Sequence, residues 1–91
     1  IGGFMILFSS PTCEKCKIVK ENFDLKNIGV RVEELTEEND EGLALLAWYE
    51  LVKKAEEGLP ILHDEKQGIT LQGEENISKY LQRIERNINR N

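Results

Sequence analysis

The chain contains two cysteines, and they are separated by two residues in the sequence Cys13-Glu14-Lys15-Cys16. On a helix, side chains at positions i and i+3 are neighbours, with Cβ atoms roughly 5–6 Å apart. A disulfide needs Cβ atoms about 3.5–4.5 Å apart, so a small adjustment of one helical turn would close the gap. The spacing therefore predicts a pair that cycles between dithiol and disulfide, with metal binding by the two sulfurs as the alternative.

The residues around the pair indicate that it stands at the start of a helix. Residues 9–12 interrupt an apolar run, and Thr12 is a plausible N-cap for a helix over 13–26. Cys13 would then be the first helical residue, where free backbone N–H groups and the helix dipole stabilise a thiolate. Cys16 would lie one turn deeper. We therefore predict that Cys13 attacks a substrate disulfide and that Cys16 resolves the mixed disulfide.

Apolar periodicity and turn residues predict seven elements in the order β-α-β-α-β-β-α. In chain order they are a strand at 4–8, a helix at 13–26, a strand at 30–35, a helix at 40–57, strands at 61–64 and 69–72, and a helix from 74 onwards. A strand–helix–strand unit implies parallel pairing through a right-handed crossover. We therefore expect one α/β domain over residues 1–91, with a four-stranded mixed sheet and helices on both faces. Residues 1–3 are interpreted as an N-terminal remnant outside the fold.

Several other residues that could do chemistry are assigned structural roles. The one histidine, His63, is interpreted as a surface or edge-strand residue. Trp48 and Tyr49 lie at core spacing in a predicted helix, and Ile18 is placed on the inner face of the first helix. The acidic stretch at 33–41 is interpreted as a solvated turn and helix start.

Charge and hydropathy exclude several classes of protein. A net charge of −5 disfavours binding to nucleic acid or to an anionic membrane surface. The sequence has no run of about 20 apolar residues, so no membrane span is predicted. Two cysteines three apart do not fit a secreted domain stapled by disulfides, and no export signal is visible. We expect a cytoplasmic monomer without nucleic-acid or membrane partners.

With these elements placed, the chain resembles the thioredoxin superfamily and, within it, the glutaredoxin-like proteins. The resemblance rests on the apolar strand at 4–8, the Cys13–Cys16 motif, the Leu59-Pro60 pair before a strand, and Gly73 before the last helix. It implies a thioredoxin-like fold and a thiol–disulfide oxidoreductase that reduces protein or small-molecule disulfides. It also implies that the peptide bond between Leu59 and Pro60 is cis.

The resemblance further implies which residues bind substrate. In the family the residue before the cis-proline offers backbone groups to a thiol substrate, so Leu59 would do so beside Pro60. Thr12 would line the same groove, and Gly73 matches the region that often contacts the tail of glutathione. No bound cofactor and no metal are implied. Glutathione and a reductase remain the two candidate electron donors.

Two other classes of protein remain open. A metal carrier could use the same cysteine pair, because Thr12-Cys13-x-x-Cys16 before a helix is similar to the copper-chaperone motif. That family usually has methionine where this chain has Pro11, and it lacks a helix corresponding to 40–57. Within a monomer, two cysteines and a distant His63 cannot close a four-ligand zinc site. The third class is an interaction module in which the cysteines do not turn over.

Overall fold

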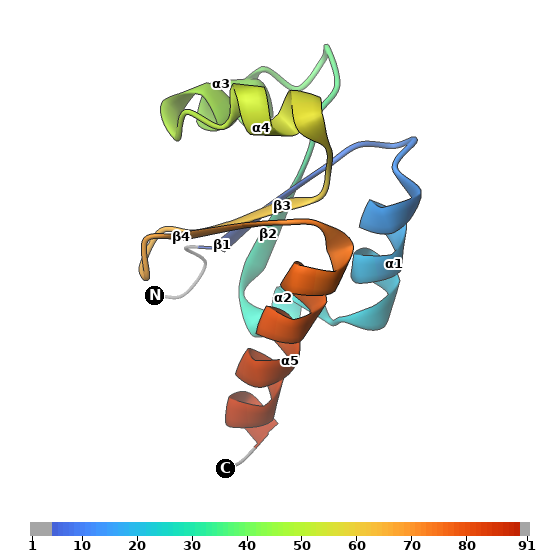
Figure 1. Ribbon diagram of the computed structural model, residues 1–91, viewed down its shortest axis with the longest axis vertical. Coiled ribbons are helices and arrows are strands. Elements are labelled where there is room, and N and C mark those ends of the chain that lie inside the picture. Colours follow the sequence, from blue (N-terminus) through green and yellow to red (C-terminus); the bar gives the residue numbers. More distant parts are fainter. Residues whose placement is uncertain (1–4, 90–91) are drawn as a thin grey trace.

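The computed structural model describes residues 5–89 (Figure 1). The elements in chain order are β1 (Met5–Ser9), α1 (Glu14–Asn22), α2 (Leu25–Ile28), β2 (Val30–Glu34), α3 (Asp40–Trp48), α4 (Val52–Glu57), β3 (Ile61–Asp64), β4 (Ile69–Gln72) and α5 (Glu74–Asn89). The predicted sequence of strands is confirmed, whereas each of the first two predicted helices is divided in two. The interpretation of residues 1–3 falls outside the described residues.

The four strands form one mixed sheet in the order β2-β1-β3-β4. Strand β1 pairs in parallel with β2 and antiparallel with β3, and β3 pairs antiparallel with β4. Residues 6–9 of β1 are all buried, because the strand is central and both of its faces are covered. An apolar run without alternation is what such a strand requires. The predicted α/β class with a four-stranded mixed sheet is therefore confirmed.

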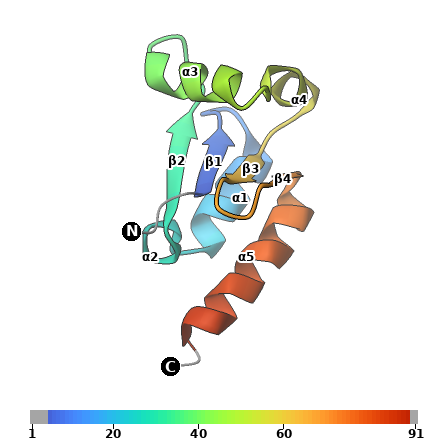
Figure 2. The same cartoon turned by 90° about the vertical axis from the view of Figure 1, so that its left-hand side faces the viewer.

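The helices bury two apolar clusters on opposite faces of the sheet (Figure 2). Helices α1, α2 and α5 cover one face, where Leu7 packs with Val19 and Leu81. Helices α3 and α4 cover the other face, where Ile6 and Phe8 pack with apolar residues of that region. Alternate residues of β1 point to opposite faces, so one strand serves both clusters. The predicted placement of helices on both faces is confirmed.

The helix predicted over 13–26 is interrupted at Phe23. The backbone of Phe23 is extended, with φ −132° and ψ 141°, and Asp24 then caps α2 by accepting the N–H of Asn27. Phe23 and Leu25 are both buried in the same cluster. In a continuous helix two residues that far apart are rotated by about 200°, so both could not face one core. Gly29 ends α2 with φ 94°, a conformation that glycine adopts without steric cost.

The helix predicted over 40–57 is interrupted for a similar reason. After Tyr49 the chain turns through Glu50, whose φ is 59°, and Leu51 donates its N–H to the carbonyl of Leu46 at 2.9 Å. Both Leu46 and Leu51 are buried in the cluster under α3 and α4. An unbroken helix would place these two leucines on different sides of its axis. The turn redirects the chain, so both reach the same apolar cluster.

Several single-residue expectations are wrong. Trp48 is 78% exposed and Ile18 is 42% exposed, so neither packs in the core. His63 lies on β3, an interior strand, where it is half-buried, contacts the ring of Tyr49 with centroids 4.1 Å apart and bonds to Thr70 at 2.8 Å. Burial lowers the pKa of His63. Ile18 and Trp48 each lie two residues after a buried residue of the same helix, Cys16 and Leu46, and so are turned about 200° away from it. The position of His63 follows from the strand order, which periodicity does not encode.

The acidic stretch is also less solvated than expected, because Glu33 is buried. Asn39 caps α3 by accepting the N–H of Gly42 at 3.0 Å, and its Nδ2 donates to Glu33 at 2.9 Å. Arg31 pairs with Glu33 and, at 2.8 Å, with Glu41. These bonds fasten the start of α3 to β2.

We predict that Gly42→Ala destabilises the protein by about 1–3 kcal/mol. Alanine normally stabilises a helix relative to glycine by about 1 kcal/mol. Here, however, the added Cβ would lie 2.5 Å from Nδ2 of Asn39 and 2.9 Å from Oε1 of Glu33, so the cap must move. Urea unfolding measures the change. Ala44→Gly, at an exposed site of α3, is the control for propensity alone, and a stabilised Gly42→Ala variant would contradict the prediction.

Tyr80 joins α5 to the end of β3. Its hydroxyl donates to the buried carboxylate of Asp64 at 2.6 Å, and Asp64 also accepts the N–H of Gln67 in the hairpin. Burial, followed by the bond to Asp64, raises the pKa of Tyr80 to about 12 from 10.0. The folded protein therefore keeps this proton at a pH where the unfolded chain loses it.

This difference predicts how stability responds to alkali. Because the folded pKa of Tyr80 lies above the unfolded value, its contribution is complete below about pH 10 and is lost as pH rises toward about 12. Tyr80→Phe should lose stability at neutral pH but show a shallower decline over that alkaline range. Unfolding free energies of both proteins across the range test this, and parallel declines would argue against the prediction.

Candidate functional site

Cys13 and Cys16 are joined by a disulfide at the start of α1, with Cα atoms 5.3 Å apart. Cys13 is the N-cap rather than the first helical residue: its backbone is extended, and its Sγ accepts the N–H of Cys16 at 3.1 Å. The predicted N-cap Thr12 and the predicted helical position of Cys13 are thus each wrong by one residue. The sulfur takes the place that a side-chain oxygen fills in most N-caps.

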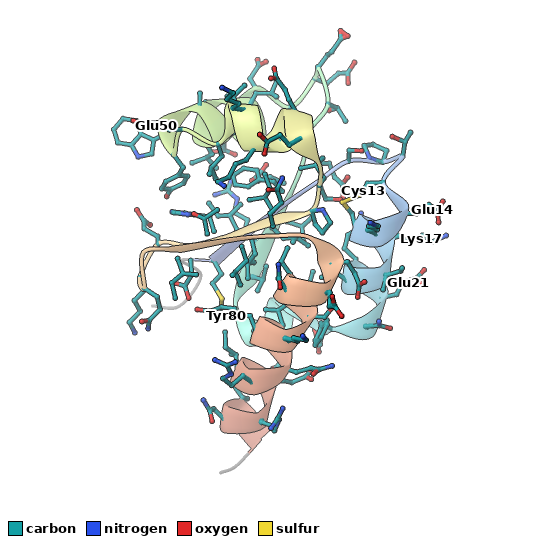
Figure 3. All side chains as sticks on the ribbon, viewed as in Figure 1. Cys13, Glu14, Lys17, Glu21, Glu50 and Tyr80 are labelled. Atoms are coloured by element: carbon teal, nitrogen blue, oxygen red, sulfur yellow. A yellow bond between two sulfur atoms is a disulfide. The ribbon has the colours of Figure 1, made fainter. Side chains whose placement is uncertain are left out.

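The two sulfurs lie in different environments. Cys16 is fully buried and lies on the same helix as the buried Val19, whereas Cys13 is half-buried. Glu14 and Lys15, between them, are exposed. Figure 3 shows the Cys13 sulfur at the top of α1, near the segment that links α4 to β3. One sulfur is therefore open to a partner while the other is enclosed.

The register of the sheet brings distant residues to this point. Phe8, near the end of β1, pairs with Ile61, the first residue of β3. Cys13 follows β1 and Pro60 precedes β3, so the antiparallel pairing directs both toward the same end of the sheet. In Figures 1 and 2 the segment between α4 and β3 passes beside the beginning of α1.

Pro60 and Gly73, both assigned to the site by resemblance, are joined by a backbone hydrogen bond. The Leu59–Pro60 peptide bond is cis, as the resemblance implies. Pro60 is buried, and its carbonyl accepts the N–H of Gly73 at 2.9 Å. Leu59 is half-buried against the cluster under α3 and α4. Thr12 is exposed, with its hydroxyl 3.4 Å from that of Ser10. Binding of substrate by these residues remains a prediction.

A hollow of about 500 Å³ lies between the cysteine motif and the start of α5. It is lined by Lys15, Gly73, Glu74, Glu75 and Asn76. Gly73 is the lining residue that the resemblance assigned to substrate binding. The sequence did not indicate that Lys15 and Asn76 lie beside it, because the packing of α1 against α5 is a long-range contact. The position of Lys15 inside the cysteine motif was the one local feature that could have indicated this hollow.

A polar bridge anchors α1 one turn beyond Cys16. Lys20 pairs with Glu34 at 2.7 Å, and Glu34 also accepts from the hydroxyl of the buried Ser9 at 3.4 Å. Ser9 and Glu34 are register partners at the ends of β1 and β2. The bridge thus fixes the cysteine-bearing helix to two strand ends, a role that sequence analysis missed.

Residues 5–89, the part of the chain that the structure describes, contain neither a candidate metal-binding cluster nor a candidate membrane span. No three histidine, cysteine, aspartate or glutamate residues gather there in a way that could hold a metal ion. No helix in that range is long and apolar enough to cross a membrane.

No protein-family model matches this chain, and no curated protein and no solved structure matches it either. The chemistry of the site therefore rests on its own residues. Its distinguishing feature is a disulfide with one half-buried sulfur and one buried sulfur at a helix start.

We predict unequal reactivity of the two thiols after reduction. Cys13 should react with iodoacetamide at neutral pH at least about tenfold faster than Cys16, because Cys16 is enclosed and its thiolate is poorly solvated. Mass spectrometry of the labelled peptides gives both rates. In Cys13→Ser, Cys16 should be labelled rapidly only in denaturant. Equal rates in the folded protein would contradict this assignment of environments.

Proposed function

We propose that this protein is a thiol–disulfide oxidoreductase with a thioredoxin-like, glutaredoxin-like fold, which reduces protein or small-molecule disulfides through Cys13 and Cys16. The observation that carries the proposal is the asymmetric disulfide at the N-terminus of α1. The strand order β2-β1-β3-β4, with helices on both faces and the cysteine pair after the first strand, supports the fold assignment.

The reaction begins with the protein in its dithiol form. The Cys13 thiolate attacks one sulfur of the substrate disulfide, forms a mixed disulfide and releases the other substrate sulfur as a thiolate. The Cys16 thiolate then attacks Sγ of Cys13, which releases the second substrate thiolate and leaves the disulfide seen here. Two electrons pass from the protein to the substrate, and the released thiolates take up protons. An external dithiol, or two glutathione molecules, returns the protein to the dithiol.

The helix start favours the attacking form of Cys13. The N–H of Cys16 donates to Cys13 Sγ, and the dipole of α1 places partial positive charge at the same point. Both interactions are stronger with a thiolate than with a thiol, so both favour ionisation. Cys16 becomes a nucleophile only within reach of a mixed disulfide on Cys13, because no substrate can approach its buried sulfur.

The hollow beside the motif bears on the electron donor. Glu74 and Glu75 line it together with Lys15, so two carboxylates and one ammonium group face it and the balance of charge repels the anionic groups of glutathione. A reductase is therefore the donor we favour over glutathione, and proteins are the favoured substrates. A reducing compartment such as the cytoplasm suits a protein that must start as the dithiol.

We predict different effects of removing each sulfur. Cys13→Ser should abolish reduction of hydroxyethyl disulfide, because the nucleophile is lost. Cys16→Ser should instead accumulate a mixed disulfide through Cys13, which mass spectrometry detects as an adduct that dithiothreitol removes. Both assays use freshly reduced protein.

The matched control is Ser10→Ala, which alters a neighbouring hydroxyl and keeps both sulfurs. It should reduce the disulfide at nearly the wild-type rate. The absence of an adduct on Cys16→Ser would refute the division of roles. Retention of a metal by the reduced wild-type protein, with protection of both thiols, would favour the metal-carrier alternative.

A further inference from the structure

Strand β4 is an unprotected sheet edge. It pairs with β3 on one side, and its residues, Ile69 to Gln72, include no charge and no proline. The opposite edge, β2, carries Arg31, Glu33 and Glu34 in five residues. Charges and prolines on an edge prevent another strand from pairing with it, so β4 lacks the protection that β2 has. Figure 2 shows the two strands at opposite sides of the sheet.

A groove runs along this edge. Its volume is about 310 Å³, and its lining comes from β4 and α5: Ile69, Leu71, Asn76, Lys79, Tyr80 and Arg83. The two β4 residues alternate along the strand and so face the same side. Ile69 is 37% exposed and Leu71 is half-buried, so the apolar floor is incompletely covered.

The α5 side of the groove is cationic. Lys79 and Arg83 are one turn apart, and both are exposed. The ion pairs found within residues 5–89 use Lys20 and Arg31, so neither groove cation is neutralised by one of them. In a chain of net charge −5, two such cations beside apolar residues favour a partner that combines apolar and acidic side chains.

The groove continues toward the cysteine pair. Asn76 lines both this groove and the 500 Å³ hollow, and Lys15 of the cysteine motif also lines that hollow. An extended segment on β4 would therefore follow a continuous surface that reaches Lys15, two residues after Cys13.

We propose that β4 and α5 form a docking groove for an extended segment of alternating apolar and acidic residues in the disulfide-bearing partner. The segment pairs its backbone with β4, places apolar side chains on Ile69 and Leu71, and directs carboxylates to Lys79 and Arg83. The docking brings the partner's disulfide to Cys13, and this last step rests on the proposed function.

The docking is tested by NMR, with isotope-labelled protein titrated with a capped peptide of alternating valine and glutamate. Saturable changes in amide chemical shift are expected in residues 69–72 and 76–83. The double variant Lys79→Glu/Arg83→Glu should bind about tenfold more weakly. The matched control, Lys26→Glu/Lys53→Glu, reverses two exposed charges elsewhere and should bind as the wild type does. Equal binding of a valine–lysine peptide, shifts confined to other elements, or no shifts at millimolar peptide would overturn the proposal.

Delivery to Cys13 is tested with the same peptide extended by a cysteine in a mixed disulfide. Lys79→Glu/Arg83→Glu should raise KM about tenfold, leave kcat unchanged, and reduce hydroxyethyl disulfide as the wild type does. An unchanged KM would overturn the proposal. If the wild type reduces neither disulfide, the proposed function fails, and the titration alone decides whether the groove docks this segment.

Discussion

The antiparallel pairing of β1 with β3 is the constraint on which the rest of the site depends. It opposes Phe8 to Ile61, so the chain leaving β1 and the chain entering β3 meet at one end of the sheet. Cys13 follows β1, and Pro60 immediately precedes β3. The bond from the N–H of Gly73 to the carbonyl of Pro60 then brings the start of α5 to the same end. A register change would separate these residues and move apolar side chains to the wrong face.

The asymmetry of the cysteine pair follows from the way α1 begins. Cys13 caps the helix with its sulfur and stays partly exposed, while Cys16, one turn further along α1, is fully buried. The bridge from Lys20 to Glu34 holds the helix against the strand ends. One helix start thus supplies a partly exposed sulfur, an N–H group that donates to it and a buried second sulfur. The proposed chemistry requires all three.

Sequence reasoning found the four strands along the chain, the hairpin and the cysteine pair, because turn residues and apolar runs are local signals. It missed the breaks at Phe23 and Glu50, where the burial of residues on both sides of a turn outweighs helical periodicity. It also misplaced Trp48 and His63. Trp48 is exposed because it lies about 200° around α3 from the buried Leu46, and the position of His63 follows from long-range strand pairing. The hollow beside Lys15 depends on the packing of α1 against α5, which no local pattern encodes.

The most direct test of the central claim is the redox equilibrium of the cysteine pair. Metal-free protein is equilibrated in buffers of defined dithiol and disulfide ratio, and the mass of the alkylated protein reports its oxidation state. A reversible two-electron transition with a midpoint between about −270 and −180 mV is predicted, within the range of thioredoxin- and glutaredoxin-like reductants. A pair that does not cycle, or that titrates as two independent thiols, would contradict the assignment of Cys13 and Cys16 to thiol–disulfide exchange.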